Sequence, residues 1–371
     1  MRNLVVVDEG FQQTEYYRKL FESAKAVSGA EQITVIISGA FLRNGFPASV
    51  DKYVRAQKLL DAGASYVVEM PSYALLLGDN QYAFAVMSML HKLPNADGVL
   101  LPYRAEDEDT FEKVRKFLFA EPFPYQAQLR KRKLQGEDPE KIYPSVAEQF
   151  VPGAESCLGT EQNRFAVELA NTLIRSYSTV QRVWLNLQNT ELSAEALPEV
   201  RDFDRQLEEE FRKCVDEKPA MQRISWMKDI FMGSDQLVER LAGLLYEGAE
   251  DFFVRAVYKG KDEKAIRRYV WGCLAGYRRI DNSISILYGF VPYVRLLAAK
   301  TDAITDRVSE EQFSYVQKAV EEFVSGAKAE VLIDLPQYKE YSALTDESKL
   351  LLERCDARLE EIRKKEGMNG K

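Results

Sequence analysis

Apolar positions in the first half of the chain alternate between short strand-like runs and helical stripes. Residues 33–37 form a β-branched run, ITVII, that ends at Ser38-Gly39. Asp51 then stands where a carboxylate caps the first turn of a helix, and a second apolar run follows at 66–68. Strand, helix and strand in this order predict a βαβ unit, the building block of parallel sheets.

The same alternation continues on both sides of this unit. Further strands are predicted over 4–7, 98–101 and 180–185, and helices over 14–27, 80–93, 106–119 and 158–175. The pattern predicts an α/β domain with a parallel, doubly wound sheet over residues 1–197. Because ligands of such sheets bind at the carboxyl ends of the strands, Ser38-Gly39 and Glu69-Met70-Pro71 are the first places to expect a site.

Beyond residue 198 the periodicity becomes helical. Long amphipathic stretches with charged outer faces cover 203–215, 234–253, 263–288, 310–326 and 345–365. A strand is indicated only at 330–333. The chain is therefore predicted to have a second, mostly α-helical domain over 198–371.

The amino-acid composition limits the kinds of ligand, metal site and catalysis that we expect. The net charge of −8 disfavours indiscriminate nucleic-acid binding and leaves room for a local basic patch. The single histidine, His91, makes histidine-based catalysis and histidine-rich metal sites improbable, and the four isolated cysteines have no metal-ligand spacing. The sequence predicts no metal site, no signal peptide and no membrane span, hence a cytoplasmic protein.

The central stretch resembles a known family. Its motifs are SGAF at 38–41, RNGFPA at 43–48, DKY at 51–53, RA at 55–56 and VEMP at 68–71. They match, in order and nearly in spacing, the pattern SGxFxQRGxPAxxDKxxRA followed by VxELP of bacterial tRNA(Met) cytidine acetate ligases. Weaker similarities follow at 123–127, at 161–168, at 179–182 and in YVRLL at 293–297.

The resemblance implies a nucleotidyltransferase-like (HUP/Rossmann-like) domain that uses ATP and Mg²⁺ to activate acetate as acetyl-adenylate. The acetyl group would then pass to the wobble cytidine of tRNA(Met). By position, it implies a nucleotide site formed by Val7, Glu9, Thr14, Tyr17, Ser38, Gly39, Asn163 and Arg182. It identifies no catalytic residue.

The phosphate-binding turn departs from the family. In place of EYNPFHNGH stands DEGFQQTEYY at 8–17, in which Glu9 is kept while Thr14 and Tyr17 replace the two histidines. Glu15 adds a negative charge where phosphates would bind, and Pro102-Tyr103-Arg104 replaces the family's GSE. The competing hypothesis is a paralogue that lacks adenylylation activity, or was repurposed, and binds RNA, a nucleotide or a protein partner.

Two basic clusters are candidates for RNA contacts. Arg130, Lys131, Arg132 and Lys133 form the one dense basic run, which is either a solvated helix face or a footprint for RNA phosphates. The second cluster combines two arginine pairs with aromatic residues that could stack on bases, although aromatic residues at this spacing are more often core. Its members are Arg267, Arg268, Arg278, Arg279, Tyr269, Trp271 and Tyr277.

Overall fold

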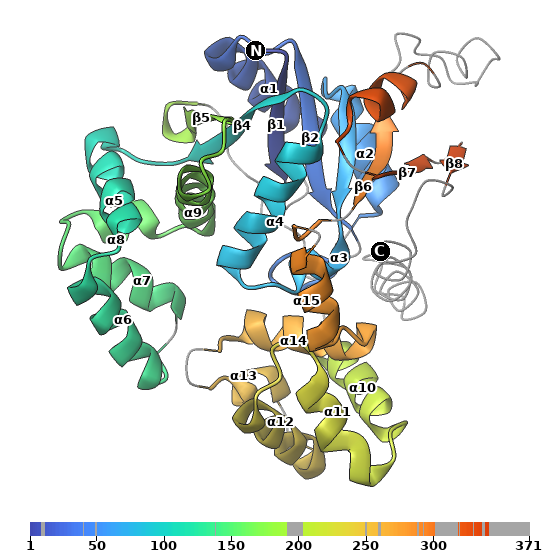
Figure 1. Ribbon diagram of the computed structural model, residues 1–371. Helices are drawn as coiled ribbons and strands as arrows, with labels where there is room; N and C mark the ends of the chain where they lie inside the picture. Colours follow the sequence, from blue (N-terminus) through green and yellow to red (C-terminus); the bar gives the residue numbers. More distant parts are fainter. Residues whose placement is uncertain are drawn as a thin grey trace.

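An eight-stranded sheet forms the centre of the molecule, in the strand order β5-β4-β1-β2-β3-β6-β7-β8 (Figure 1). The computed structural model describes residues 1–8, 12–39, 41–48, 50–137, 139–190, 203–248, 251–258, 261–287, 289–291, 293–300, 318, 320–328, 330–335 and 338–340. Five strands are mutually parallel: β1 (Asn3–Asp8), β2 (Gln32–Ser38), β3 (Tyr66–Met70), β4 (Ala96–Tyr103) and β5 (Gln181–Asn186). The predicted parallel sheet and its βαβ unit are confirmed.

Helices cover both faces of these strands. Helices α1 (Thr14–Ser28) and α2 (Lys52–Asp61) pack on one face, and α4 (Asp79–Lys92) and α9 (Glu161–Arg175) pack on the other. Successive side chains of β1 alternate accordingly, since Leu4 and Val6 belong to the core under α1 whereas Val5 belongs to the core under α4. The short α3 (Ser72–Leu75) connects β3 to α4.

Two helical lobes extend from this α/β core (Figure 1). The first lobe contains α5 (Glu108–Ala120), α6 (Phe123–Leu134), α7 (Pro139–Glu148) and α8 (Ala154–Leu158), and it has a core of its own. The second lobe contains α10 (Phe203–Asp216), α11 (Arg223–Asp229), α12 (Asp235–Glu247), α13 (Phe252–Ala256), α14 (Glu263–Ala275) and α15 (Arg279–Leu287). Two 3₁₀ turns, η1 (Leu187–Asn189) and η2 (Ala220–Gln222), complete the regular structure before β6.

The last part of the described chain returns to the sheet. Strand β6 (Tyr293–Ala299) pairs antiparallel with β3, β7 (Glu330–Leu335) pairs parallel with β6, and β8 (Tyr338–Glu340) pairs antiparallel with β7. The strand predicted at 330–333 is therefore confirmed. The prediction that it would be the only strand after 198 is wrong, because the buried run at 293–299 is a strand as well.

Two predicted helices are each broken by a glycine. The stretch 234–253 divides at Gly248 and the stretch 263–288 divides at Gly276, both of which end a helix with a positive φ of 64° and 66° respectively. This left-handed conformation is easily reached by glycine and ends the helical hydrogen-bond pattern. Residues 320–326 are helical, whereas 310–317 and the stretch predicted at 345–365 lie outside the described residues.

None of the helices among the described residues has the length and apolar character needed to cross a membrane.

Candidate nucleotide site

The turn after β2 lies at the carboxyl edge of the parallel strands, where ligands of such sheets bind. Arg55 of α2 fixes its backbone. Its Nη2 donates to the carbonyl oxygens of Ser38 (2.7 Å) and Gly39 (2.6 Å), and its Nη1 donates to the Ser38 hydroxyl (3.3 Å). A guanidinium that is 3% exposed thus sets the path of the chain at this edge.

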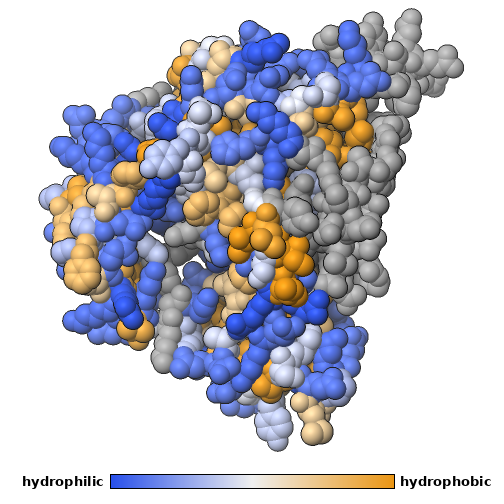
Figure 2. Space-filling model, viewed as in Figure 1, coloured by the Kyte–Doolittle hydropathy of each residue, from blue (hydrophilic) through white to orange (hydrophobic). Residues whose placement is uncertain are grey.

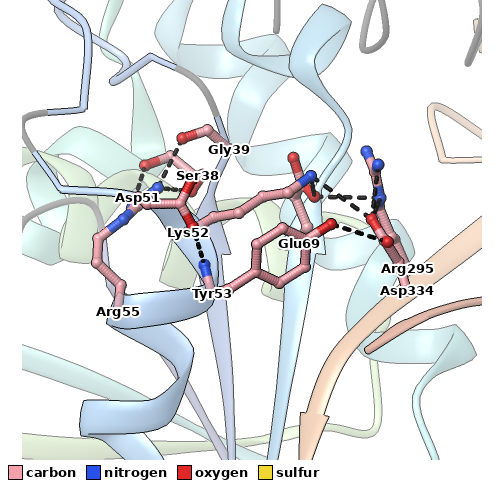
Figure 3. Close-up of polar contacts among 9 residues, drawn as sticks. All are labelled: Ser38, Gly39, Asp51, Lys52, Tyr53, Arg55, Glu69, Arg295 and Asp334. Atoms are coloured by element: carbon pink, nitrogen blue, oxygen red, sulfur yellow. Dashed lines mark hydrogen bonds and ion pairs between the residues drawn. The ribbon is translucent and has the colours of Figure 1, made fainter. Parts of the chain in front are cut away.

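A cluster of buried charges lies beside this turn (Figure 3). The Lys52 ammonium is 2.9 Å from Glu69 Oε2 and 3.6 Å from Asp334 Oδ2. Arg295 completes the cluster, with Nε 3.2 Å from Glu69 Oε2 and Nη2 2.8 Å from Asp334 Oδ2. Tyr53 donates to Asp334 Oδ1 at 2.8 Å. Two cations therefore neutralise two carboxylates, which makes burial of all four tolerable.

This cluster connects the carboxyl edge to the last strands of the sheet. Glu69 comes from β3, Arg295 from β6 and Asp334 from β7. Glu69 also lies against Gly39, where a Cβ would collide with its carboxylate, so the turn requires glycine. The predicted importance of Ser38 and Gly39 is consistent with this packing, in which both are positioned by buried charged side chains.

The hydroxyl of Tyr17 in α1 contacts both the last residue of β1 and the backbone just before α1. The Tyr17 hydroxyl donates to Asp8 Oδ2 (2.8 Å) and accepts from the backbone N–H of Gln12 (3.0 Å). Burial, together with the charge of Asp8, raises the pKa of Tyr17, which therefore stays protonated. Thr14 begins α1, Val7 lies next to Asp8 in β1, and Glu9 lies outside the described residues.

Asn163 connects α9 to the end of β4. Its side chain accepts from the backbone N–H of Arg104 (2.9 Å) and donates to the carbonyl oxygens of Arg104 (2.7 Å) and Cys157 (2.7 Å). Arg104 was not among the site residues predicted from the sequence. It follows β4 at the carboxyl edge, and its positive charge lowers the pKa of Tyr16 against the larger effects of burial and Asp8, which raise it. Arg104 and Asp8 thus both act electrostatically on Tyr16.

Arg182 lies away from these residues. It is the second residue of β5 and pairs with Val99, which lies in the amino-terminal half of β4. The strand begins at Gln181 and ends at Asn186, so Arg182 lies near its amino end and not at its carboxyl end. The structure therefore places Arg182 at the amino edge of the sheet, opposite Ser38 and Gly39.

The two basic clusters have different surroundings. In α6, Arg130 and Lys131 are exposed, while Arg132 forms an ion pair with Glu137 and Lys133 donates to the Tyr143 hydroxyl (2.5 Å). The second cluster lies largely in the protein core, so its buried aromatic rings offer no exposed surface on which an RNA base could stack. Its residues Arg267, Arg268, Tyr269, Trp271 and Tyr277 are all at most 8% exposed.

The loop before α2 docks on the second helical lobe through this core. Phe41 stacks on Trp271 with ring centroids 5.2 Å apart, and the Trp271 indole donates to the carbonyl oxygen of Gly45 at 2.8 Å. Gly45 has a φ of 84°, and a Cβ there would lie 2.6 Å from the Cβ of Arg267. The motif RNGFPA therefore serves an interface between the α/β core and α14.

Comparisons with known proteins agree with this architecture. The family model described as HIGH Nucleotidyl Transferase matches residues 18–194. The tRNA(Met) cytidine acetate ligase of Clostridium perfringens is 23% identical over 186 residues, which cover 46% of this chain and 46% of the relative. The enzyme of the same name from Acetivibrio thermocellus is 28% identical over 109 residues, covering 29% and 26%. The chain thus matches less than half the length of these curated relatives.

A solved structure extends the similarity in fold to nearly the whole chain. Thermotoga maritima TmcAL bound with alpha-thio ATP superposes with a TM-score of 0.67 at 17% identity, covering 97% of this chain and 92% of that one. Its apo form gives a TM-score of 0.65. In the motifs at 38–71, in the relatives it matches and in its fold, the chain is similar to the tRNA(Met) cytidine acetate ligases, and its residues 8–17 contain no histidine.

Proposed function

We propose that the protein binds ATP at the carboxyl edge of β1, β2 and β4 and acts as an ATP-dependent RNA-modifying ligase of the kind for which its relatives are named. One observation carries the proposal: buried charges hold the Ser38-Gly39 turn at this edge. Burying charges costs free energy. A protein that functioned only through its outer surface would not require Arg55, Lys52 and Glu69 to be buried in order to fix one backbone turn.

The chemistry of such a ligase relies on positioning. A carboxylate oxygen of acetate attacks the α-phosphorus of ATP and pyrophosphate leaves. An exocyclic amine of RNA then attacks the acetyl carbon of the acetyl-adenylate, AMP leaves and the amine loses a proton. Cations and hydrogen-bond donors accelerate the first step by stabilising charge that develops on the phosphate oxygens. Arg104, whose charge acts on Tyr16 as that of Asp8 does, is the side chain we assign to this role, in place of the family's histidines.

The residues at this edge fit Mg²⁺ only as an ion that is bound mainly by the phosphates of ATP. No group of three or more histidine, cysteine, aspartate or glutamate side chains suited to a metal ion occurs among the described residues. Mg²⁺ commonly binds through substrate phosphates with one or two carboxylates. Asp8 is the carboxylate at this edge that could supply such a contact.

The RNA partner we propose is tRNA, as the names of the relatives indicate. The exposed Arg130 and Lys131 of α6 are positioned to contact its phosphates, because they lie on the outer surface of the first helical lobe. A tRNA substrate would place the protein in the cytoplasm. Acetate would be the carboxylate that is activated.

A second candidate function is nucleotide or RNA binding without adenylylation. It is favoured by the Tyr17–Asp8 hydrogen bond and by the contacts of Asn163 with Arg104 and Cys157. These contacts occupy two side chains that the family resemblance assigns to the nucleotide. In this alternative the fold and the turn after β2 are kept while the reaction is lost.

Calorimetric titration with Mg-ATP tests the proposal, followed by an assay for acetate-dependent formation of AMP. Arg104→Ala is expected to weaken ATP binding about 10- to 150-fold, since a hydrogen bond to a charged group contributes about 1.5–3 kcal/mol. Arg182→Ala is the matched control and should leave the affinity unchanged. ATP binding without AMP formation would favour the second candidate. Absence of ATP binding at millimolar concentration would overturn both the site and the ligase function.

A further inference from the structure

A cavity of about 380 Å³ lies between the two helical lobes, apart from the turn after β2. Its walls come from α5, α6, α7 and α9 on one side and from α14 and the loop containing Arg43 on the other. In the space-filling view the surface is hollowed between these lobes (Figure 2). Volumes of this order suit small organic ligands.

One wall residue makes the cavity a candidate binding site. Asn171 of α9 is 2% exposed, lines the cavity, and has an Oδ1 atom without a hydrogen-bond partner among the described residues. Leaving a buried amide oxygen without a partner costs free energy unless a ligand or water satisfies it. An asparagine amide offers one acceptor and donors side by side, which match the paired donor and acceptor on the edge of a nucleobase.

The remaining walls supply the other contacts that a nucleotide needs. The rings of Tyr125 and Phe165 line the cavity and offer surfaces on which a base can stack. Lys133, Arg164 and Arg268 line it too, beside carboxylates such as Glu168, and are cations with which a phosphate could pair. Burial, followed by the effects of Tyr143, Glu121 and Glu168, raises the pKa of Tyr125, so that its hydroxyl remains a hydrogen-bond donor.

We infer that this cavity is a binding pocket for one unpaired nucleobase with its phosphate, read through the amide of Asn171. The inference is independent of ATP binding at the carboxyl edge and rests on the proposed function only for the choice of a cytidine probe. The base reaches the pocket either as a free nucleotide or as part of single-stranded RNA, and the two sources share this chemistry.

Equilibrium binding of CMP to the full chain tests the inference, with ribose 5-phosphate as the probe that keeps the phosphate and lacks the base. CMP is expected to bind at least tenfold more tightly than ribose 5-phosphate. Asn171→Leu should abolish this preference. Asn282→Leu is the matched control, because Asn282 is also buried with an unsatisfied Oδ1 but does not line the cavity.

The folding of the variants separates a binding role from a structural one. Asn171→Leu should leave the unfolding midpoint unchanged or raise it, since a buried amide without a partner is replaced by an apolar group. Equal affinity for CMP and ribose 5-phosphate, or CMP binding unaffected by Asn171→Leu, would overturn the inference. A large loss of stability in Asn171→Leu would do the same, by showing that the amide is structural.

A short single-stranded oligocytidine distinguishes the two sources. Tighter binding of the oligonucleotide than of CMP would identify RNA, and similar affinities would identify a free nucleotide. Failure here is distinguishable from failure of the proposed function, because Mg-ATP binding is measured separately. Binding of ATP without CMP would reject only the pocket, and binding of CMP without ATP would reject only the site at the carboxyl edge.

Discussion

At the scale of single residues, Lys52 depends on the carboxylates around it. It is 4% exposed, and Glu69 and Asp334 surround its ammonium group. Lys52→Met leaves an excess of buried negative charge, and removal of one partner from a buried ion pair typically costs about 3–5 kcal/mol. We therefore expect the free energy of unfolding, measured by urea denaturation, to fall by about that amount.

An exposed ion pair is the control for this prediction. Arg18 pairs with Glu15 on the surface of α1, where both side chains are about half exposed or more. Arg18→Met should change the free energy of unfolding by less than about 1 kcal/mol. Equal effects of the two substitutions would show that burial of the cluster contributes nothing to stability.

The role of a residue could be predicted from the sequence where it depends on contacts with residues nearby in the chain. Asp51 was expected to cap a helix, and its carboxylate accepts from the backbone N–H of Tyr53 at 2.9 Å. The partners of Lys52 could not be predicted in the same way, because Arg295 and Asp334 come from strands far along the chain. Arg104 was seen only as a departure from the family pattern, since nothing in the sequence shows that its charge acts on Tyr16.

At the scale of elements, Gly276 determines where α14 ends. It has a φ of 66°, and a Cβ there would meet no atom within 4 Å. Gly276→Ala should therefore destabilise the protein by about 1 kcal/mol, through backbone strain alone. Gly243→Ala is the control: this glycine lies inside α12, also with open space around it, and alanine there should stabilise by about 0.5–1 kcal/mol. Thermal unfolding of the two variants should shift in opposite directions, and shifts of the same sign would contradict the explanation.

Glu161 joins three elements and makes the stability depend on pH. Its carboxylate is 2.8 Å from Arg43 Nη2 and 2.7 Å from Lys264 Nζ. Burial alone would raise its pKa, but the charges of Arg43 and Lys264 lower the pKa to about 2. The stabilisation is therefore fully present above the ordinary pKa near 4.5 and is lost as the pH falls toward 2.

The pH dependence can be measured with Glu161→Gln. The variant should be less stable than the parent by about 1–2 kcal/mol at pH 7, less than the pKa change alone would give, because 41% of the Glu161 side chain is exposed. The difference should shrink below pH 4.5 in urea denaturation curves. A difference that is constant from pH 7 to pH 3 would mean that Glu161 acts through packing and not through its charge.

At the scale of the whole molecule, the sequence predicted the alternating half well and the return of the chain to the sheet poorly. In the first half of the chain, short apolar runs such as β1 and β2 alternate with amphipathic helices, and this alternation is a strong signal for an α/β fold. In β6, all seven residues of YVRLLAA are buried, so the strand has no polar alternation to separate it from a buried helix. Its partner β3 was recognised only as the end of the βαβ unit, although it is an interior strand of the sheet.

The return of β6 and β7 to the sheet brings the predicted domain boundary at 197/198 into question. Whether a fragment of residues 1–197 folds by itself can decide this question. A chain of residues 1–197 lacks β6 and β7, so β3 becomes an edge strand with Val67 and Val68 uncovered. Lys52 and Glu69 would also lose Arg295 and Asp334. We expect this fragment to unfold without a cooperative transition in circular dichroism, whereas a fragment of residues 1–340, which keeps all eight strands, should retain one. Cooperative unfolding of 1–197 would instead establish it as an autonomous domain. The last strands would then be an addition to a sheet that is stable without them.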